Sequence, residues 1–168
     1  MENKGFKIET MTSSKLKGTA WEDVDVDEIA MIFISYGRSV GHLQFLYVKD
    51  GKFSLSGSHG DPIENLETIK LDYPSEYVIG VNGRHGIFGT DRILKSITFV
   101  TNKNSYGPFP RDKPTYMGVE DTEFNINVLD HGWINGFHGT MFGGQLESFG
   151  VYIKPVPIIT PPKNDMNE

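Results

Sequence analysis

The segment of the chain best suited to holding a ligand is glycine-rich and ends in a carboxylate, Gly139–Glu147. Glycines such as Gly143 and Gly144 let a ligand approach the backbone closely and reach its N–H donors. The Glu147 carboxylate can accept hydrogen bonds from neighbouring hydroxyl groups. Donors and an acceptor converging on one small loop suit a sugar. The alternative left open by the residues is an ordinary hairpin whose Glu147 faces solvent.

The acidic run at 22–28 is the second candidate, because its aspartates alternate as they do in a calcium-binding loop. Such a loop needs glycine at its sixth position and a bidentate glutamate at its twelfth. Here Glu28 and Ile34 stand at those positions, so a solvated turn is expected. The sequence predicts no metal site and no cofactor.

Motifs for catalysis are absent from the sequence. The five histidines do not show the His-x-x-x-His spacing of a zinc hydrolase, and no Gly-x-Ser-x-Gly nucleophile motif occurs. Gly80-x-x-Gly83-x-x-Gly86 does not match the dinucleotide-binding fingerprint. His138, between phenylalanine and glycine, reads as a hydrogen-bonded structural residue. The absence of cysteine excludes thiol catalysis. We therefore expect a binding protein and not an enzyme.

Charge and composition narrow the possible partners. The 168 residues suit one domain, and 12% aromatic residues with 19 Gly and 9 Pro favour short strands broken by turns. A net charge of −6 without a basic cluster repels phosphate backbones, so nucleic acid is not an expected partner. No apolar run reaches the roughly 18 residues of a membrane span, and no apolar leader is visible. We expect a cytoplasmic or nucleocytoplasmic protein with no membrane partner.

The elements that must position these residues alternate with period two, which places one set of side chains on a buried face. A short β-branched run at 29–34 reads as a buried strand. Dipeptides at Asp50-Gly51, Asn82-Gly83 and Gly143-Gly144 predict hairpin turns. The alternating sets are Ile69/Leu71/Tyr73, Tyr77/Ile79/Val81, Phe124/Ile126/Val128 and Phe149/Val151/Ile153.

An internal repeat is suggested by three similar runs led by Leu43, Leu94 and Leu146, spaced by 51 and 52 residues. Each run follows a strand and a glycine-containing turn. Three units of about four strands would give a pseudo-threefold arrangement. Coincidence among β-rich hairpins is the alternative explanation.

Several short motifs resemble those of the jacalin-related lectins of plants, over about residues 5 to 154. They include Trp21-Glu22-Asp23, Ser105-Tyr106-Gly107-Pro108-Phe109, Ile134-x-Gly136-Phe137-His138-Gly139 and Gly150-Val151-Tyr152. The resemblance implies an all-β fold, a β-prism of three four-stranded Greek-key sheets with pseudo-threefold symmetry. It places the lectin domain at 1–155 and leaves 156–168 as a Pro-rich tail that we expect to be disordered.

The resemblance also implies a site. In the mannose-type branch the sugar sits between the first loop and the last hairpin loop, which reads Gly-x-x-x-Asp. Glu147 replaces that aspartate, and its extra methylene shifts the carboxylate by about 1.5 Å. The first loop has one glycine where the family has paired glycines. The site carried over comprises Gly18, Gly143, Gly144, Gln145, Leu146 and Glu147, with Arg84 and His85 in a flanking loop.

Two functions follow from the resemblance. The first is binding of a mannose- or glucose-type glycan in plant stress or defence, by a homo-oligomer that gains avidity from several weak sites. The second is an intracellular module for protein interaction or antiviral resistance that has lost sugar binding. The altered first loop and the Asp-to-Glu change favour the second.

Overall fold

In the computed structural model, residues 5–11, 16–111 and 120–156 are described, and they form β-strands joined by turns. No helix occurs among these residues, so none is long and apolar enough to cross a membrane. The expected tail lies almost wholly outside the described residues, as do residues 12–15 of the first loop. The thirteen strands are β1 (Phe6–Glu9), β2 (Thr19–Asp23), β3 (Glu28–Tyr36), β4 (Val40–Lys49), β5 (Lys52–Leu55), β6 (His59–Gly60), β7 (Asn65–Lys70), β8 (Val78–Phe88), β9 (Asp91–Thr101), β10 (Ser105–Phe109), β11 (Thr122–Asn127), β12 (Gly132–Phe142) and β13 (Gln145–Pro155).

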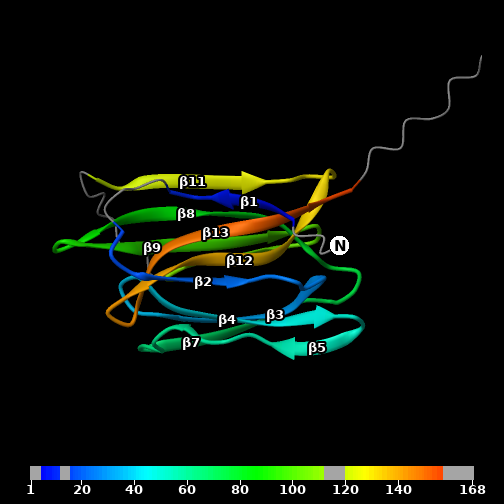
Figure 1. The fold of residues 1–168 in the computed structure, drawn as a ribbon, viewed down its shortest axis with the longest axis horizontal. Helices are drawn as coiled ribbons and strands as arrows, with labels where there is room; N and C mark the ends of the chain where they lie inside the picture. The colour runs from blue at the N-terminus through cyan, green and yellow to red at the C-terminus, as the bar shows by residue number, and fades with distance from the viewer. Residues whose placement is uncertain (1–4, 12–15, 112–119, 157–168) are drawn as a thin grey trace, which may run out of the picture.

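The strands form three antiparallel sheets arranged as a prism (Figure 1). Sheet 1 has the order β1-β13-β12-β2, sheet 2 has β10-β9-β8-β11, and sheet 3 has β5-β4-β3-β7. Each is built on a central hairpin. In sheets 2 and 3 the strand that flanks the first arm of the hairpin returns from further along the chain, as in a Greek key. In sheet 1 the flanking strands come from the N-terminal part of the chain. The predicted β-prism is confirmed, with one addition: β6 also pairs with β4, so sheet 3 has five strands.

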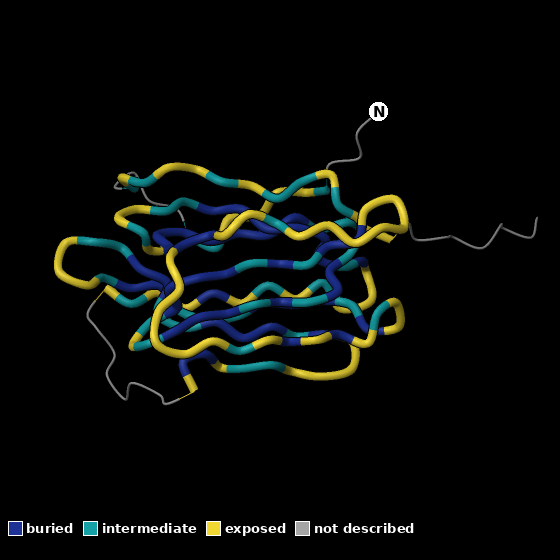
Figure 2. The backbone as a smooth tube through the Cα atoms, turned by 90° about the horizontal axis from the view of Figure 1, so that it is seen from below, coloured by how far each residue is buried: buried dark blue, intermediate teal, exposed yellow. Residues whose placement is uncertain are grey.

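The core lies between the inner faces of the three sheets, as the dark buried stretches of the central strands show (Figure 2). The rings of Phe45 and Phe137 stack with centroids 4.3 Å apart, and Phe137 also stacks on Phe149 at 5.3 Å. Phe45 belongs to sheet 3, and Phe137 and Phe149 belong to sheet 1. Phe99 of sheet 2 meets Phe137 edge-on. Burying each such side chain contributes roughly 1.5–3 kcal/mol. The central hairpins are therefore held by shared aromatic packing.

Matching β-bulges show how the three sheets correspond. In each central hairpin the register shifts twice, and the residues left unpaired at the turn-side shift are Gly41, Lys95 and Glu147. The repeat is thus real, but its first run was aligned three residues too late. Val40, not Leu43, occupies the position of Leu94 and Leu146. Period-two patterns do not reveal a bulge, because the extra residue changes pairing without changing composition.

The turns were predicted correctly at two of the three dipeptides. Asp50-Gly51 and Gly143-Gly144 have positive φ at both positions, as a tight hairpin turn requires. The prediction at Asn82-Gly83 was wrong, since both residues lie inside β8. A Cβ at Gly83 would lie 2.1 Å from the carbonyl oxygen of Ser96, so this glycine serves close packing and not a turn.

The first alternating set also extends past the strand that it predicts. β7 ends at Lys70, and the chain then turns between Asp72 and Glu76, where the Glu76 N–H donates to the Asp72 carbonyl at 2.8 Å. Leu71 stays buried, and its N–H still donates to the Ala30 carbonyl of β3 at 3.0 Å. The apolar alternation therefore continues one residue past the end of β7, because Leu71 is still bonded to β3.

Candidate functional site

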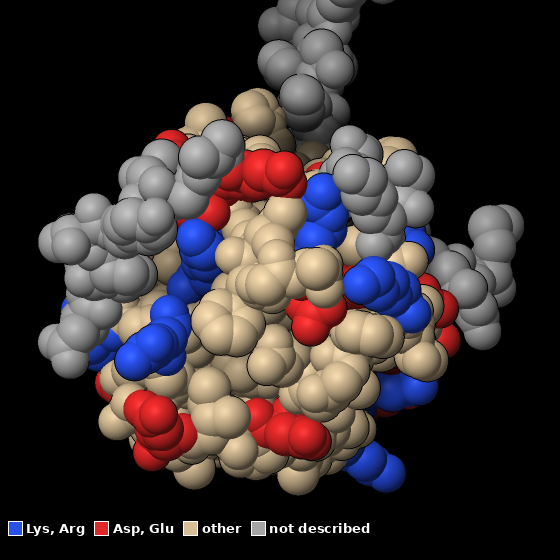
Figure 3. All heavy atoms as spheres, turned by 90° about the vertical axis from the view of Figure 1, so that its left-hand side faces the viewer, with Lys and Arg blue, Asp and Glu red and all other residues tan. Residues whose placement is uncertain are grey.

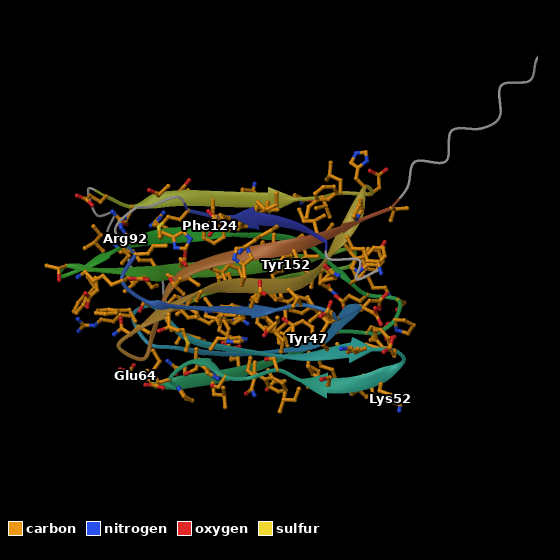
Figure 4. All side chains as sticks on the ribbon, viewed as in Figure 1. Tyr47, Lys52, Glu64, Arg92, Phe124 and Tyr152 are labelled. Atoms are coloured by element: carbon orange, nitrogen blue, oxygen red, sulfur yellow. The ribbon has the colours of Figure 1, made fainter. Side chains whose placement is uncertain are left out.

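The candidate site lies at the end of the prism where the β3–β4, β8–β9 and β12–β13 turns project, at the left of Figure 1. Figure 3 faces this end: uncharged side chains cover most of its centre, and acidic and basic ones lie around them. Figure 4 places Glu64 and Arg92 at this same end, on the sheet 3 and sheet 2 sides. The glycine-rich segment predicted to bind a ligand forms the β12–β13 hairpin here.

Glu147 is buried, with 2% of its surface exposed, so the alternative of an ordinary hairpin with a solvent-facing carboxylate is wrong. Its Oε1 accepts hydrogen bonds from the Gly18 backbone N–H at 2.9 Å and from Thr140 Oγ1 at 2.8 Å. Its Oε2 accepts from the Lys17 backbone N–H at 2.8 Å. Because Glu147 is the unpaired residue of a bulge, its side chain leaves the alternation of β13 and reaches the first loop.

Gly18 is in close contact with this carboxylate for a steric reason. A Cβ at residue 18 would lie 2.3 Å from the carbonyl oxygen of Met141 and 2.8 Å from Glu147 Oε1. Any side chain would push the first loop away and break the two amide-to-carboxylate bonds. Gly18 and Glu147, both carried over as site residues, thus meet in a contact within the protein.

The four remaining residues of the last loop divide into three kinds. Gly143 and Gly144 form the two-residue turn, with φ of 58° and 75°. Gln145 is exposed and borders an apolar hollow of about 370 Å³ between the three turns, together with Ile87 and Phe88. Leu146 is fully buried in the core. Only its backbone could meet a ligand.

The flanking loop carried over from the resemblance is not a loop. Arg84 and His85 lie within β8. Arg84 pairs with Glu123 at 3.2 Å on sheet 2. His85 is buried, with Nε2 2.6 Å from Thr10 Oγ1, and burial lowers its pKa to about 4. Both residues pair with β11 on one side, and on the other side they pair with β9 across the bulge at Lys95, so they stay in the sheet.

Two acidic residues at this end were missed by the sequence analysis. The Asp61 backbone N–H donates to the Gly144 carbonyl at 2.8 Å, although the two residues are far apart in the chain. Asp91, in the β8–β9 hairpin, lies 3.7 Å from the Lys17 ammonium. Neither belongs to a motif. Only the packing of sheets 2 and 3 against sheet 1 brings them here.

The acidic run of the sequence analysis takes part in structure. Asp23 accepts from the Tyr47 hydroxyl at 2.8 Å and lies 2.8 Å from His59 Nε2, and Asp27 accepts from the Asp50 backbone N–H at 2.9 Å. His138 Nε2 lies 3.0 Å from the Ile8 carbonyl, which confirms its structural role. Among the described residues, no group of three or more His, Cys, Asp and Glu is placed to hold a metal ion.

Comparison with known proteins gives consistent matches. A family model described as "Jacalin-like lectin domain" matches residues 11–152. Protein RESTRICTED TEV MOVEMENT 1 of Arabidopsis thaliana is 33% identical over 149 residues, covering 86% of this chain and 82% of that protein. Jacalin-related lectin 3 of the same plant is also 33% identical, over 83% of this chain, but the chain spans only 22% of that longer protein.

Solved structures match over nearly their whole lengths. A mannose-binding lectin from champedak superposes with a TM-score of 0.76 at 27% identity, covering 92% of this chain and 99% of that one. A mannose-binding jacalin-related lectin from Ananas comosus gives a TM-score of 0.73 at 31% identity, covering 89% and 99%.

Proposed function

Since the chain belongs to the jacalin-like lectin family, we propose that it is a carbohydrate-binding protein whose ligand is a mannose- or glucose-type glycan. The observation that carries this proposal is the Gly143–Gly144 turn lying next to a first loop held at Gly18. It exposes backbone donors on one small surface with carboxylates nearby. The two solved lectins described above are mannose-binding proteins that share the fold.

The pseudo-threefold repeat indicates one such site per chain. The three equivalent bulge positions hold Gly41, Lys95 and Glu147, so only one carries a carboxylate tied to a neighbouring loop. Calorimetric titration with methyl α-mannoside should give saturable binding with one site per chain and an affinity in the millimolar range typical of a weak single site. Methyl α-galactoside is the matched control. Absence of heat with mannosides and glucosides, together with a silent glycan array, would contradict the proposal.

A second candidate function is protein interaction without sugar binding. The observation that favours it is the burial of Glu147, whose carboxylate already accepts three hydrogen bonds from the protein. The match to Protein RESTRICTED TEV MOVEMENT 1 over most of both chains is compatible with it. A protein partner that binds equally well in saturating mannoside, with no glycan bound on an array, would support this function over the first.

We propose further that two copies associate through the outer face of sheet 3, because that face is apolar. Phe53, Leu55 and Leu66 on its strands are each at least 60% exposed. Apolar surface gathered on one exposed sheet face commonly marks an interface. The strand residues facing that side include two charged ones, Glu28 and Lys70, of opposite sign. Two copies of an acidic chain can therefore meet there with little like-charge repulsion.

This association is tested by sedimentation velocity across a range of concentrations. The wild type should shift from monomer toward dimer, and Leu55→Lys should stay monomeric because it places a charge in the interface. Phe6→Lys is the matched control, since Phe6 is 67% exposed on β1 of sheet 1. A wild type that stays monomeric at all concentrations, or a Leu55→Lys protein that still dimerises, would contradict the interface.

The cellular setting remains a prediction. We propose that the protein acts in the cytoplasm, with or without a nuclear pool, in plant stress or defence, and that it has no enzymatic activity. Absence of cysteine is compatible with a reducing compartment. Cell fractionation tests the first point. Incubation with mannosides, followed by a search for free sugar, tests the last.

A further inference from the structure

The glycan site needs an acceptor for sugar hydroxyls, and Glu147 is poorly placed for that task. Three internal donors use its two oxygens, and the residue is 2% exposed. Because Glu147 is buried against the first loop, a ligand hydroxyl could reach its oxygens only if that loop moved, which would break the hydrogen bonds of the Lys17 and Gly18 amides. Glu147 therefore fastens the first loop to the last hairpin. The acceptor must be sought among exposed carboxylates beside the same turn.

Asp61 lies directly against that turn. It follows β6 on sheet 3, yet its backbone N–H donates to the Gly144 carbonyl at 2.8 Å. A Cβ at Gly144 would lie 2.2 Å from Asp61 Oδ2, so the carboxylate covers the Cα of Gly144. Glycine at 144 thus serves two ends. It accepts a φ of 75°, and it leaves room for the carboxylate of another sheet.

The Asp61 carboxylate is also available. Asp61 is exposed, and among the described residues its carboxylate has no hydrogen bond or ion pair. The N–H groups of Gly143 and Gly144 likewise have no hydrogen-bond partner within the described part of the chain. Asp91, on the sheet 2 side of this end, faces the Lys17 ammonium at 3.7 Å. One free acceptor and two free donors therefore meet at the tip of the β12–β13 hairpin.

We propose that Asp61 is the residue that accepts hydrogen bonds from the glycan, in place of Glu147. This inference rests on the proposed carbohydrate-binding function. A carboxylate with two free oxygens can accept from two adjacent hydroxyls of one sugar ring, while the turn N–H groups donate to further sugar oxygens. The ligand class is a terminal hexose with a free vicinal diol. The site is shared between sheet 3 and sheet 1.

Calorimetry with methyl α-mannoside on the full chain tests the assignment, with Asp61→Asn as the main variant. Loss of a charged acceptor should weaken binding about tenfold or more. Asp61→Glu should weaken it as well, because a longer arm misplaces the oxygens although the charge is kept. Both variants keep the backbone N–H bond to Gly144, so their unfolding midpoints should match that of the wild type. Asp91→Asn is the matched control and should stay within about twofold, as expected for a screened surface charge.

The outcomes separate this inference from the proposed function. If the wild type binds and Asp61→Asn binds equally well, Asp61 is not the acceptor, and the carbohydrate-binding function stands. If Asp91→Asn alone loses binding, the acceptor is on the sheet 2 side and the inference is overturned. If the wild type binds no sugar on calorimetry or an array, the function itself fails, and the inference fails with it.

Discussion

The indole of Trp21 stacks face to face on the imidazole of His59, with ring centroids 3.7 Å apart and planes inclined by 13°. Trp21 belongs to β2 of sheet 1 and His59 to β6 of sheet 3. His59 Nε2 also lies 2.8 Å from the Asp23 carboxylate, which accepts from the Tyr47 hydroxyl. These contacts hold sheets 1 and 3 together along one edge of the prism. The same contacts also position Asp61, two residues after His59, beside the Gly143–Gly144 turn.

Removal of the Trp21 indole should therefore weaken the contact between sheets 1 and 3. Trp21→Ala should lower the free energy of unfolding by about 3 kcal/mol, because it leaves a cavity over His59 and Gly139. Urea denaturation measures the change. Trp133→Phe is the control, since Trp133 makes an exposed hydrogen bond to the Asp27 carbonyl and should lose about 1 kcal/mol or less. A loss below 1 kcal/mol for Trp21→Ala would show that the stack does not join the sheets.

The Glu147 carboxylate should contribute more to stability than an exposed carboxylate does. Glu147→Gln keeps the shape but turns one acceptor into a donor facing an amide, so it should cost about 2 kcal/mol of unfolding free energy. Glu123→Gln is the matched control, because Glu123 has a side chain 70% exposed and one surface ion pair. It should cost less than about 0.5 kcal/mol. Equal shifts of the urea midpoint in the two variants would contradict the role of Glu147 in holding the first loop.

Gly18 should be intolerant of any side chain. Gly18→Ala forces a methyl group against the Met141 carbonyl and the Glu147 carboxylate, so both stability and mannoside affinity should fall. Gly57→Ala is the control, because nothing lies within 4 Å of its Cβ position. It should be neutral or slightly stabilising, since alanine restricts the unfolded chain. Thermal unfolding and calorimetry of both variants check this, and a Gly18→Ala protein that behaves as the wild type would disprove the steric argument.

Stability should fall as the pH drops from neutrality, in part because of His85. Burial lowers the pKa of His85 to about 4, against 6.5 in the unfolded chain. Between these values the unfolded chain binds a proton that the folded chain does not, so this contribution is complete above pH 6.5 and is lost down to about pH 4. From pH 7 to pH 5 the loss from this residue is about 2 kcal/mol. Urea titrations at a series of pH values measure it.

A histidine substitution isolates that contribution. His85→Gln can still bond to Thr10 and should flatten the pH dependence between pH 7 and 5. His131→Gln is the control, because the side chain of His131 is 69% exposed, and it should leave the slope unchanged. Burial also lowers the pKa of His42 and His138, so part of the slope persists in His85→Gln. Parallel curves for the wild type and His85→Gln would rule out the proposed role.

The sequence alone determined the all-β architecture, because burial and turn formation depend on residue patterns that can be recognised locally. Alternation with period two marks which side chains face the core, and Asp50-Gly51 and Gly143-Gly144 mark tight turns through their tolerance of positive φ. The motifs that resemble those of the jacalin-related lectins then predicted that the strands form a β-prism. The failures of this reading, at Asn82-Gly83 and in the alignment of Leu43, both come from packing and bulges that leave no periodic signal.

The candidate site was decided by tertiary structure. The sequence identified Gly18 and Glu147 but could not show that the carboxylate turns inward to the first-loop amides, because that depends on a bulge and on contacts 129 residues apart. It offered no sign of Asp61, which belongs to another sheet. Local patterns report burial and turns. The direction in which a side chain leaves a strand, and what meets it there, is fixed only when three sheets close around one core.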